Sequence, residues 1–157
     1  MNRLLVLLSL LLFAYSCKTD STAGMKELSL LQYGAPITIK APEGVEVKKS
    51  DLGVFQDITV KNEEGYYIQI LASTATTLDV GEIKTSLMED IKNSTFFSRI
   101  LEEMEDGFIY EKKIDENNIN YSFRRIKVMG DMEYVFQTGL VGKYTLEQVR
   151  AMYDAVE

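Results

Sequence analysis

Apolar and polar residues alternate with a period of two along residues 54–61. Such an alternation predicts a strand with one buried face. Residues 66–72 form a second apolar run, and the polar segment 62–65 between the two runs ends in a glycine. Together they predict a β-hairpin, because glycine can take the positive φ that a tight loop needs. A shorter strand is predicted over 37–40, between two prolines that suit strand ends.

The period changes at Asp79, after which most apolar positions fall three or four residues apart. These positions are Val80, Ile83, Leu87, Ile91, Phe97, Ile100, Leu101 and Met104. Their spacing predicts a long amphipathic helix, with Asp79 as its N-cap and Gly107 at its end. Residues 93–95, Asn-Ser-Thr, have low helix propensity, so we expect the helix to bend or restart there.

Strand patterns return after this helix. Residues 108–114 and 119–128 are predicted as two strands joined by the polar turn 115–118. A tight turn at 130–131 then leads into a last strand over 132–141.

Within the second of these strands the apolar positions change parity halfway along. The five positions are Ile119, Tyr121 and Phe123 before the change, and Ile126 and Val128 after it. We expect a β-bulge near Arg124–Arg125, because one extra residue there would turn all five positions toward the core.

A closing helix is predicted after Thr145, which suits an N-cap. Consecutive strands joined by short turns pair antiparallel. The predicted fold class is therefore α+β, with a single antiparallel sheet of about six strands flanked by one long helix and one C-terminal helix. The order of elements over residues 28–157 resembles the Mog1/PsbP-like fold, and it is similar to an uncharacterised lipoprotein family of Bacteroidota. That resemblance implies a binding or assembly role, since known members of the fold mostly act in that way.

Residues 1–16 combine a positive charge at Arg3 with an apolar run and small residues ahead of Cys17. This is the pattern of a secretory signal peptide. A transmembrane helix needs about 20 apolar residues. This run is shorter, and the polar residues 18–20 follow it at once. We therefore expect residues 1–16 to be a signal peptide.

The end of this segment, Ala14-Tyr15-Ser16-Cys17, resembles the lipobox of bacterial lipoprotein precursors. The resemblance implies cleavage before Cys17 and acyl chains, palmitate among them, on that residue. Ala14 and Tyr15 depart from the usual lipobox, so ordinary secretory cleavage, which would leave a soluble protein, stays an alternative. Cys17 is the only cysteine and cannot form an internal disulfide, and acylation explains its position.

Residues 17–27 are then expected to form a lipidated N-terminus and flexible tether, and residues 28–157 a single α+β domain. Residues 20–22, Asp-Ser-Thr, also resemble a short O-glycosylation signal of some Bacteroidota envelope proteins, with a plain linker as the alternative. Lys18 after Cys17 resembles the sorting pattern of Gram-negative lipoproteins that reach the outer membrane. The pattern leaves open whether the domain faces the periplasm or the cell surface.

The chain is acidic, with a net charge of −7 at pH 7, and its basic residues cluster no more densely than in adjacent pairs. A nucleic-acid binder needs a basic face that neutralises phosphates. We therefore expect no nucleic-acid partner. The expected partners are a membrane, through the N-terminal lipid, and an unidentified envelope protein or small ligand.

The chain contains no histidine. The commonest general base, the Ser-His-Asp arrangement and the commonest zinc ligand are therefore absent, and the single cysteine is expected to carry lipid. The glycines do not form a nucleophile elbow, a dinucleotide fingerprint or a phosphate-binding loop. We expect a protein that is not an enzyme and that uses no cofactor or metal.

Adjacent carboxylates are the remaining candidates for acid–base chemistry. They are Glu63–Glu64, Glu89–Asp90, Glu102–Glu103, Glu105–Asp106 and Asp115–Glu116. A glycosidase needs two carboxylates about 5–9 Å apart across one cleft. Adjacent residues rarely face one cleft, so a solvated surface is the favoured interpretation. An envelope hydrolase that acts on glycans with carboxylates and tyrosines is the alternative function.

Aromatic residues on the predicted strands are a second candidate. They are Tyr66, Tyr67, Tyr110, Tyr121, Tyr134 and Phe136. Beneath the helices such residues are core. On an open face, Tyr121 and Phe123 beside Arg124 and Arg125 could contact an anionic ligand. The favoured function is a non-catalytic, lipid-anchored binding or envelope-assembly module, with a surface-exposed interaction protein as a further alternative.

Overall fold

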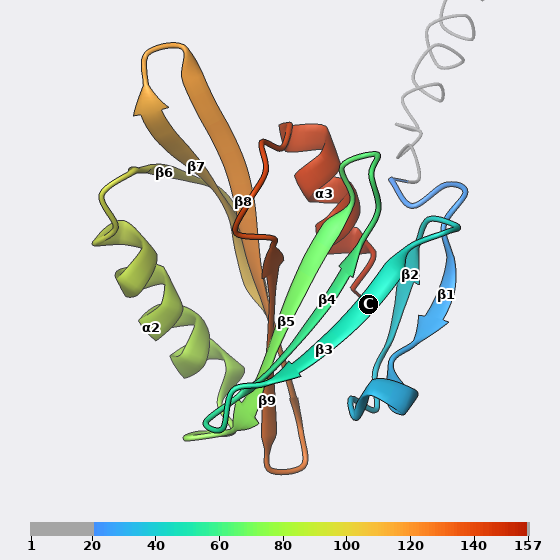
Figure 1. The fold of residues 1–157 in the computed structure, drawn as a ribbon. Helices are drawn as coiled ribbons and strands as arrows, with labels where there is room; N and C mark the ends of the chain where they lie inside the picture. The colour runs from blue at the N-terminus through green and yellow to red at the C-terminus, as the bar shows by residue number, and fades with distance from the viewer. Residues whose placement is uncertain (1–20, 157) are drawn as a thin grey trace, which may run out of the picture.

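A computed structural model of the protein describes residues 21–156 (Figure 1). The predicted signal peptide, Cys17 and the first part of the predicted tether lie outside the described residues. The elements in chain order are β1 (Lys26–Ser29), the 3-10 helix η2 (Leu31–Tyr33), β2 (Thr38–Ala41), β3 (Glu46–Asp51), β4 (Gln56–Lys61), β5 (Tyr67–Thr74), α2 (Val80–Lys92), β6 (Phe97–Met104), β7 (Gly107–Asp115), β8 (Asn118–Met129), β9 (Met132–Thr138) and α3 (Leu146–Asp154).

The fold is α+β, as predicted, and its main sheet has seven strands in the order β3-β4-β5-β9-β8-β7-β6. Every neighbouring pair in this sheet is antiparallel. Strands β1 and β2 form a second, two-stranded sheet. The prediction of a single sheet with about six strands is therefore corrected. Figure 1 shows α2 on one side of the main sheet, with α3 and the small sheet on the other.

The strand register assigns alternate residues to the two sides of the main sheet. On the side covered by α3, which we call the α3 face, Ile58, Ile70 and Phe136 are aligned across three neighbouring strands and are fully buried. On the side covered by α2, the α2 face, Leu71 is paired with Val135. Burial of each large apolar side chain contributes about 1.5–3 kcal/mol. The main hydrophobic cluster contains the three aligned residues together with Val149 and Met152 of α3, so the main core lies on the α3 face.

Helix α3 begins at Thr145, as predicted, and the start is a complete capping box. The Thr145 hydroxyl accepts a hydrogen bond from the Gln148 amide, and the Gln148 side chain accepts one from the Thr145 amide. Val149 and Met152 are buried against the α3 face. Beyond the helix, the Lys40 amide donates to the Ala155 carbonyl at 2.7 Å, which joins the small sheet to the end of the chain.

The predicted long helix is wrong in its second half. Helix α2 begins after Asp79, as predicted, but it ends at Lys92, and residues 97–104 form strand β6. Two register shifts interrupt the pairing of β6 with β7. A bulge places two residues opposite one, so the inward positions of such a strand fall three or four apart and imitate a helical period. Gly107 begins strand β7 and does not end a helix.

The predicted bulge at Arg124–Arg125 is also wrong. Strand β8 pairs in unbroken register with β9 from Arg124 to Met129, so adjacent residues alternate between the faces. Phe123 is buried on the α3 face, whereas Ile126 is buried on the α2 face. The apolar parity changes because helices cover both faces of this strand.

Besides β6, two further strands, β1 and β3, were not predicted, and two predicted boundaries move. The sequence of β3 is Glu-Val-Lys-Lys-Ser-Asp, which suits a charged edge strand but lacks an apolar alternation. Strand β1 begins at Lys26, and Thr22 is buried, so the predicted tether over 17–27 overlaps the folded domain. Strand β9 ends at Thr138, short of the predicted residue 141.

Candidate functional site

A groove of about 370 Å³ lies between helix α2 and the α2 face of the main sheet. It is lined by Val54, Phe55, Leu71, Ser73, Leu87, Asp90, Ile91, Arg124, Glu133, Val135 and Gln137. The volume is within the range of small-molecule sites. The lining is apolar along the middle and carries charged or polar groups toward the ends.

The groove exists because α2 is only partly seated on the sheet. Ile83 is the buried residue of this helix, while Leu87 and Ile91 remain half-buried. The floor comes from Leu71 of β5 and Val135 of β9, which are directly paired. The loop between β3 and β4 supplies the opposite wall.

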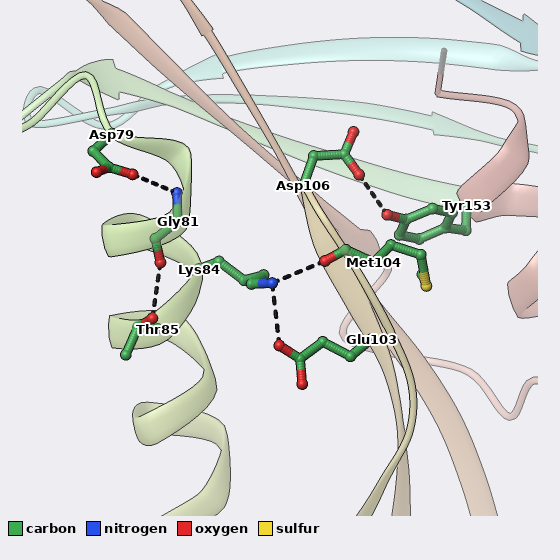
Figure 2. Close-up of polar contacts among 8 residues, drawn as sticks. All are labelled: Asp79, Gly81, Lys84, Thr85, Glu103, Met104, Asp106 and Tyr153. Carbon is green, nitrogen blue, oxygen red and sulfur yellow. Dashed lines mark hydrogen bonds and ion pairs between the residues drawn. The ribbon is translucent and has the colours of Figure 1, made fainter.

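Polar contacts fix the N-terminal half of α2 (Figure 2). The Asp79 carboxylate accepts the Gly81 amide at 2.8 Å, and this N-cap begins the helix. The Lys84 ammonium donates to the Met104 carbonyl at 2.9 Å and lies 3.1 Å from the Glu103 carboxylate. The Lys84 contacts attach α2 to β6. The C-terminal half of the helix, from Leu87 onward, lines the groove.

Arg124 is the cationic group of the groove. Its Nη1 donates to the Phe123 carbonyl at 3.0 Å, and its guanidinium carbon lies 5.7 Å from the centre of the Tyr110 ring. Within residues 21–156, no carboxylate lies within 4.0 Å of this guanidinium. Burial lowers the pKa of Arg124, and nearby Tyr110 acts in the opposite direction. A half-buried cation without a counter-ion favours an anionic partner.

A row of polar side chains leads across the α2 face to Arg124. The Gln69 amide donates to the Asp57 carboxylate at 2.7 Å, and the Gln137 amide donates to Gln69 at 2.7 Å. Gln137 is directly paired with Arg124 across β9 and β8. The Asp57 Oδ1 atom is buried and has no hydrogen-bond partner within residues 21–156. The hydrogen bonds of this row fix the orientation of Gln137 beside Arg124.

Glu133 lies toward the other end of the groove. It is four residues before Gln137 on β9, a separation of about 13 Å along a strand. Burial raises the pKa of the Glu133 carboxyl. Glu133 also lines a neighbouring hollow of about 230 Å³ beside the first turns of α2. Asp90 is exposed at the rim of the groove.

The structure divides the four predicted contact residues between the two faces. Arg124 lines the groove on the α2 face. Tyr121, Phe123 and Arg125 have the opposite parity on β8 and belong to the α3 face. Phe123 is fully buried and makes an edge contact with Tyr153, with ring centres 5.8 Å apart. These four residues therefore do not form one surface.

Arg125 belongs to a structural cluster that joins α3 to the turn between β6 and β7. Its Nε donates to Asp106 at 2.8 Å, and its Nη1 donates to the Tyr153 carbonyl at 3.0 Å. The Tyr153 hydroxyl donates to Asp106 at 2.6 Å (Figure 2). Burial alone would raise the pKa of Asp106, but the hydrogen bonds and the Arg125 charge bring that pKa below its ordinary value.

Most other residues that the sequence suggested as candidates take part in ion pairs, turns or core packing. Glu102 pairs with Arg150 at 2.6 Å, Glu103 with Lys84, and Asp115 accepts the Asn117 amide within its turn. Among the predicted aromatic residues, Tyr67 and Tyr121 are half-buried, and the buried ones are Tyr66, Tyr110, Tyr134 and Phe136. The part of the chain that the structure describes holds no group of carboxylates arranged for a metal ion.

An acidic hollow of about 560 Å³ lies between the loop that precedes β3 and the β4–β5 loop. Its lining is Glu43, Gly44, Glu46, Lys61, Asn62, Glu63 and Glu64. Glu43 pairs with Lys26 at 3.2 Å and Glu46 with Lys48 at 3.0 Å, and all four side chains are largely exposed. Exposed pairs of this kind contribute little to stability or recognition. The groove beside α2 is therefore the better candidate site.

Sequence reasoning identified Arg124 but missed the rest of the groove. A signal was present in β5 and β9, where apolar residues occupy both parities and Gln69 and Gln137 interrupt them. Apolar residues on both parities indicate a strand covered on both faces. The pairing that brings Leu71 beside Val135 could not be inferred from spacing.

Across residues 21–156, no helix is long and apolar enough to cross a membrane. Comparison of the chain with models of protein families, with curated proteins and with solved structures finds no match.

Proposed function

We propose that the protein is a non-catalytic binding module of the bacterial cell envelope, held at the outer membrane by lipid on Cys17. The observation that supports a binding role is the groove beside α2. It combines an open apolar floor with a half-buried guanidinium that lacks a carboxylate partner within the described chain. Sites for small molecules have this composition, a mostly apolar concavity with a few fixed polar groups.

The anchor is the second part of the proposal, and the sequence around Cys17 supports it. The Mog1/PsbP-like relationship also stays a proposal drawn from the order of elements, and it points to binding or assembly as well. Replacement of Cys17 by Ala is expected to release the protein from membranes, because the acyl chains would be lost. Recovery of the variant in carbonate-washed membranes would contradict the anchor. Protease treatment of intact cells would show which side displays the domain.

The binding role is tested by native mass spectrometry of the protein extracted gently from its own membranes. A ligand-bound mass is expected for the wild-type chain. Ser73 lines the groove, so Ser73→Trp would fill it and is expected to abolish the bound mass. Ser50 is exposed on the edge strand β3 and outside the groove, so Ser50→Trp is the matched control. An unchanged ligand mass in Ser73→Trp would reject the groove as the site.

A second function, hydrolysis of envelope glycans, is supported by one observation. Glu133 and Asp90 both line the groove, and burial raises the pKa of Glu133, as a general acid requires. An enzyme of this kind would lose at least about a hundredfold in rate in Glu133→Gln, since a general acid typically contributes that much. Incubation of the wild type and this variant with envelope glycans decides between the two functions.

A further inference from the structure

We propose that the groove beside α2 binds a linear aliphatic monocarboxylate, with its carboxylate on Arg124 and its chain along Leu71, Val135 and Leu87. This assignment rests on the proposed binding function and names the ligand class of the same site.

Arg124 differs from the other arginines in residues 21–156. The others each have a carboxylate partner: Arg99 pairs with Glu111, Arg125 with Asp106 and Arg150 with Glu102. Arg124 has only the Phe123 carbonyl and the Tyr110 side chain. A guanidinium has five N–H donors in a fork that fits a carboxylate. Its position in the groove therefore provides an anion contact that the described protein leaves unused.

The chain contacts follow from the floor and the wall of the groove. Leu71 is half-buried on β5, and Leu87 and Ile91 are half-buried on α2. Val54, at the rim, is 83% exposed, which leaves its apolar surface in water in the unliganded protein. Covering such surface removes it from water and therefore favours binding of an aliphatic chain. A chain that runs from Arg124 toward Glu133 would cover a distance of about 13 Å.

The number of charges on the ligand is limited by the two acids of the groove. Asp90 lies at the rim, and Glu133 lines the far end. Both acids repel a dianion such as a phosphate monoester more strongly than a single carboxylate, which gains Arg124 and keeps its uncharged tail beside Glu133. Lys112 is a second cation near Arg124, but it does not line the groove. The raised pKa of Glu133 agrees with a far end that disfavours negative charge.

The test is a titration of the purified protein with decanoate below its micelle concentration, followed by NMR of the leucine and valine methyl groups. Saturable shifts at Leu71, Leu87 and Val135 are expected. Decanamide, which has the same chain and no charge, is expected to bind at least tenfold more weakly. Decyl phosphate is expected to bind more weakly than decanoate.

Three variants distinguish the loss of the Arg124 charge from a loss of fold. Arg124→Gln is expected to weaken decanoate at least tenfold and to leave decanamide unchanged. Arg150→Gln, which removes an arginine on α3 outside the groove, is expected to bind decanoate as the wild type does. Thermal unfolding of each variant identifies any loss of fold, and Arg124→Lys, which retains the charge, should recover part of the affinity.

Three results would overturn the ligand class: equal affinity for decanoate and decanamide, tighter binding of decyl phosphate, or no decanoate binding in the millimolar range. None of them affects the proposed binding role, which is rejected at this groove if the wild-type protein carries no ligand from its membranes or if Ser73→Trp keeps that ligand. The two proposals can therefore fail separately.

Discussion

The Tyr153 hydroxyl donates a hydrogen bond to the Asp106 carboxylate at 2.6 Å, and this contact joins α3 to the turn between β6 and β7 (Figure 2). The residues are far apart in the sequence, so the contact forms only when α3 is seated on the sheet. Arg125 donates to the same carboxylate. The cluster therefore connects three segments of the domain.

The first prediction concerns the pH dependence of this cluster. The folded-state pKa of Asp106 lies below the ordinary value of 3.8, so its contribution to stability is present above 3.8 and is lost as the pH falls through the folded-state pKa. Tyr153→Phe removes one hydrogen bond and is expected to cost about 1 kcal/mol at neutral pH. The difference in melting temperature between the two proteins should shrink well below pH 3.8. If the melting temperatures of the wild type and Tyr153→Phe differed as much in acid as at neutral pH, the proposed link between Asp106 ionisation and stability would be contradicted.

The second prediction concerns Glu133. Burial raises its folded-state pKa, so the stability contributed by its protonated form is present below the ordinary pKa and is lost as the pH rises through the raised value. Glu133→Gln is therefore expected to raise the melting temperature at neutral pH and to have little effect in acid. Glu116→Gln, in the exposed turn between β7 and β8, is the matched control and should leave the melting temperature unchanged both at neutral pH and in acid. A variant that melts below the wild type at neutral pH would show that Glu133 makes a favourable contact as an anion.

These two acids illustrate what the sequence could and could not predict. Asp106 and Glu133 both stand beside other acidic or apolar residues, and nothing in their spacing separates a structural carboxylate from one that lines a groove. Their surroundings are set by contacts between segments far apart in the chain. The hairpins of β4–β5 and β8–β9 were predictable because their strands and turns are adjacent in sequence.

Irregular strands and edge strands were the failures of the fold prediction. In β6, bulges gave the apolar residues a helical spacing, and in β3 the apolar alternation was replaced by charges suited to an edge. For the site, adjacent arginines in the sequence suggested one surface, but alternation along β8 sends Arg124 and Arg125 to opposite faces. Only the paired strands reveal that Arg124 meets Gln137.

The third prediction concerns Asn120, which fixes the loop between β9 and α3. Its buried side chain accepts the Tyr144 amide at 2.8 Å and the Tyr121 amide at 2.9 Å, and it donates to the Gly142 carbonyl at 3.0 Å. Asn120→Ala would leave these backbone groups unpaired at a cost of about 1–3 kcal/mol each where they stay buried. We expect a loss of at least about 2 kcal/mol in urea unfolding.

Asn117→Ala is the matched control for this variant. Asn117 is exposed in the turn between β7 and β8, where its backbone amide, and not its side chain, donates to Asp115. Its replacement is expected to change the free energy of unfolding by less than about 0.5 kcal/mol. Similar losses in the two variants would mean that the Asn120 hydrogen bonds contribute little.

The last prediction concerns Gly107, the first residue of β7. A Cβ atom there would lie 2.2 Å from the Arg124 carbonyl oxygen, 2.9 Å from the Arg125 Cα and 3.0 Å from the Tyr153 ring. Two of these neighbours are backbone atoms of a paired strand and cannot move aside alone, so β8 would have to shift. Gly107→Ala is therefore expected to cost at least about 1–3 kcal/mol, the usual range for overpacking.

In Gly81→Ala, by contrast, the new Cβ meets only the Asp79 side chain, at 3.2 Å. Alanine is favoured over glycine within a helix by about 1 kcal/mol, which offsets the small shift required of Asp79, so this control should lose much less stability than Gly107→Ala. A Gly107→Ala variant as stable as the control would show that β7 and β8 are less closely packed at this point than the structure indicates.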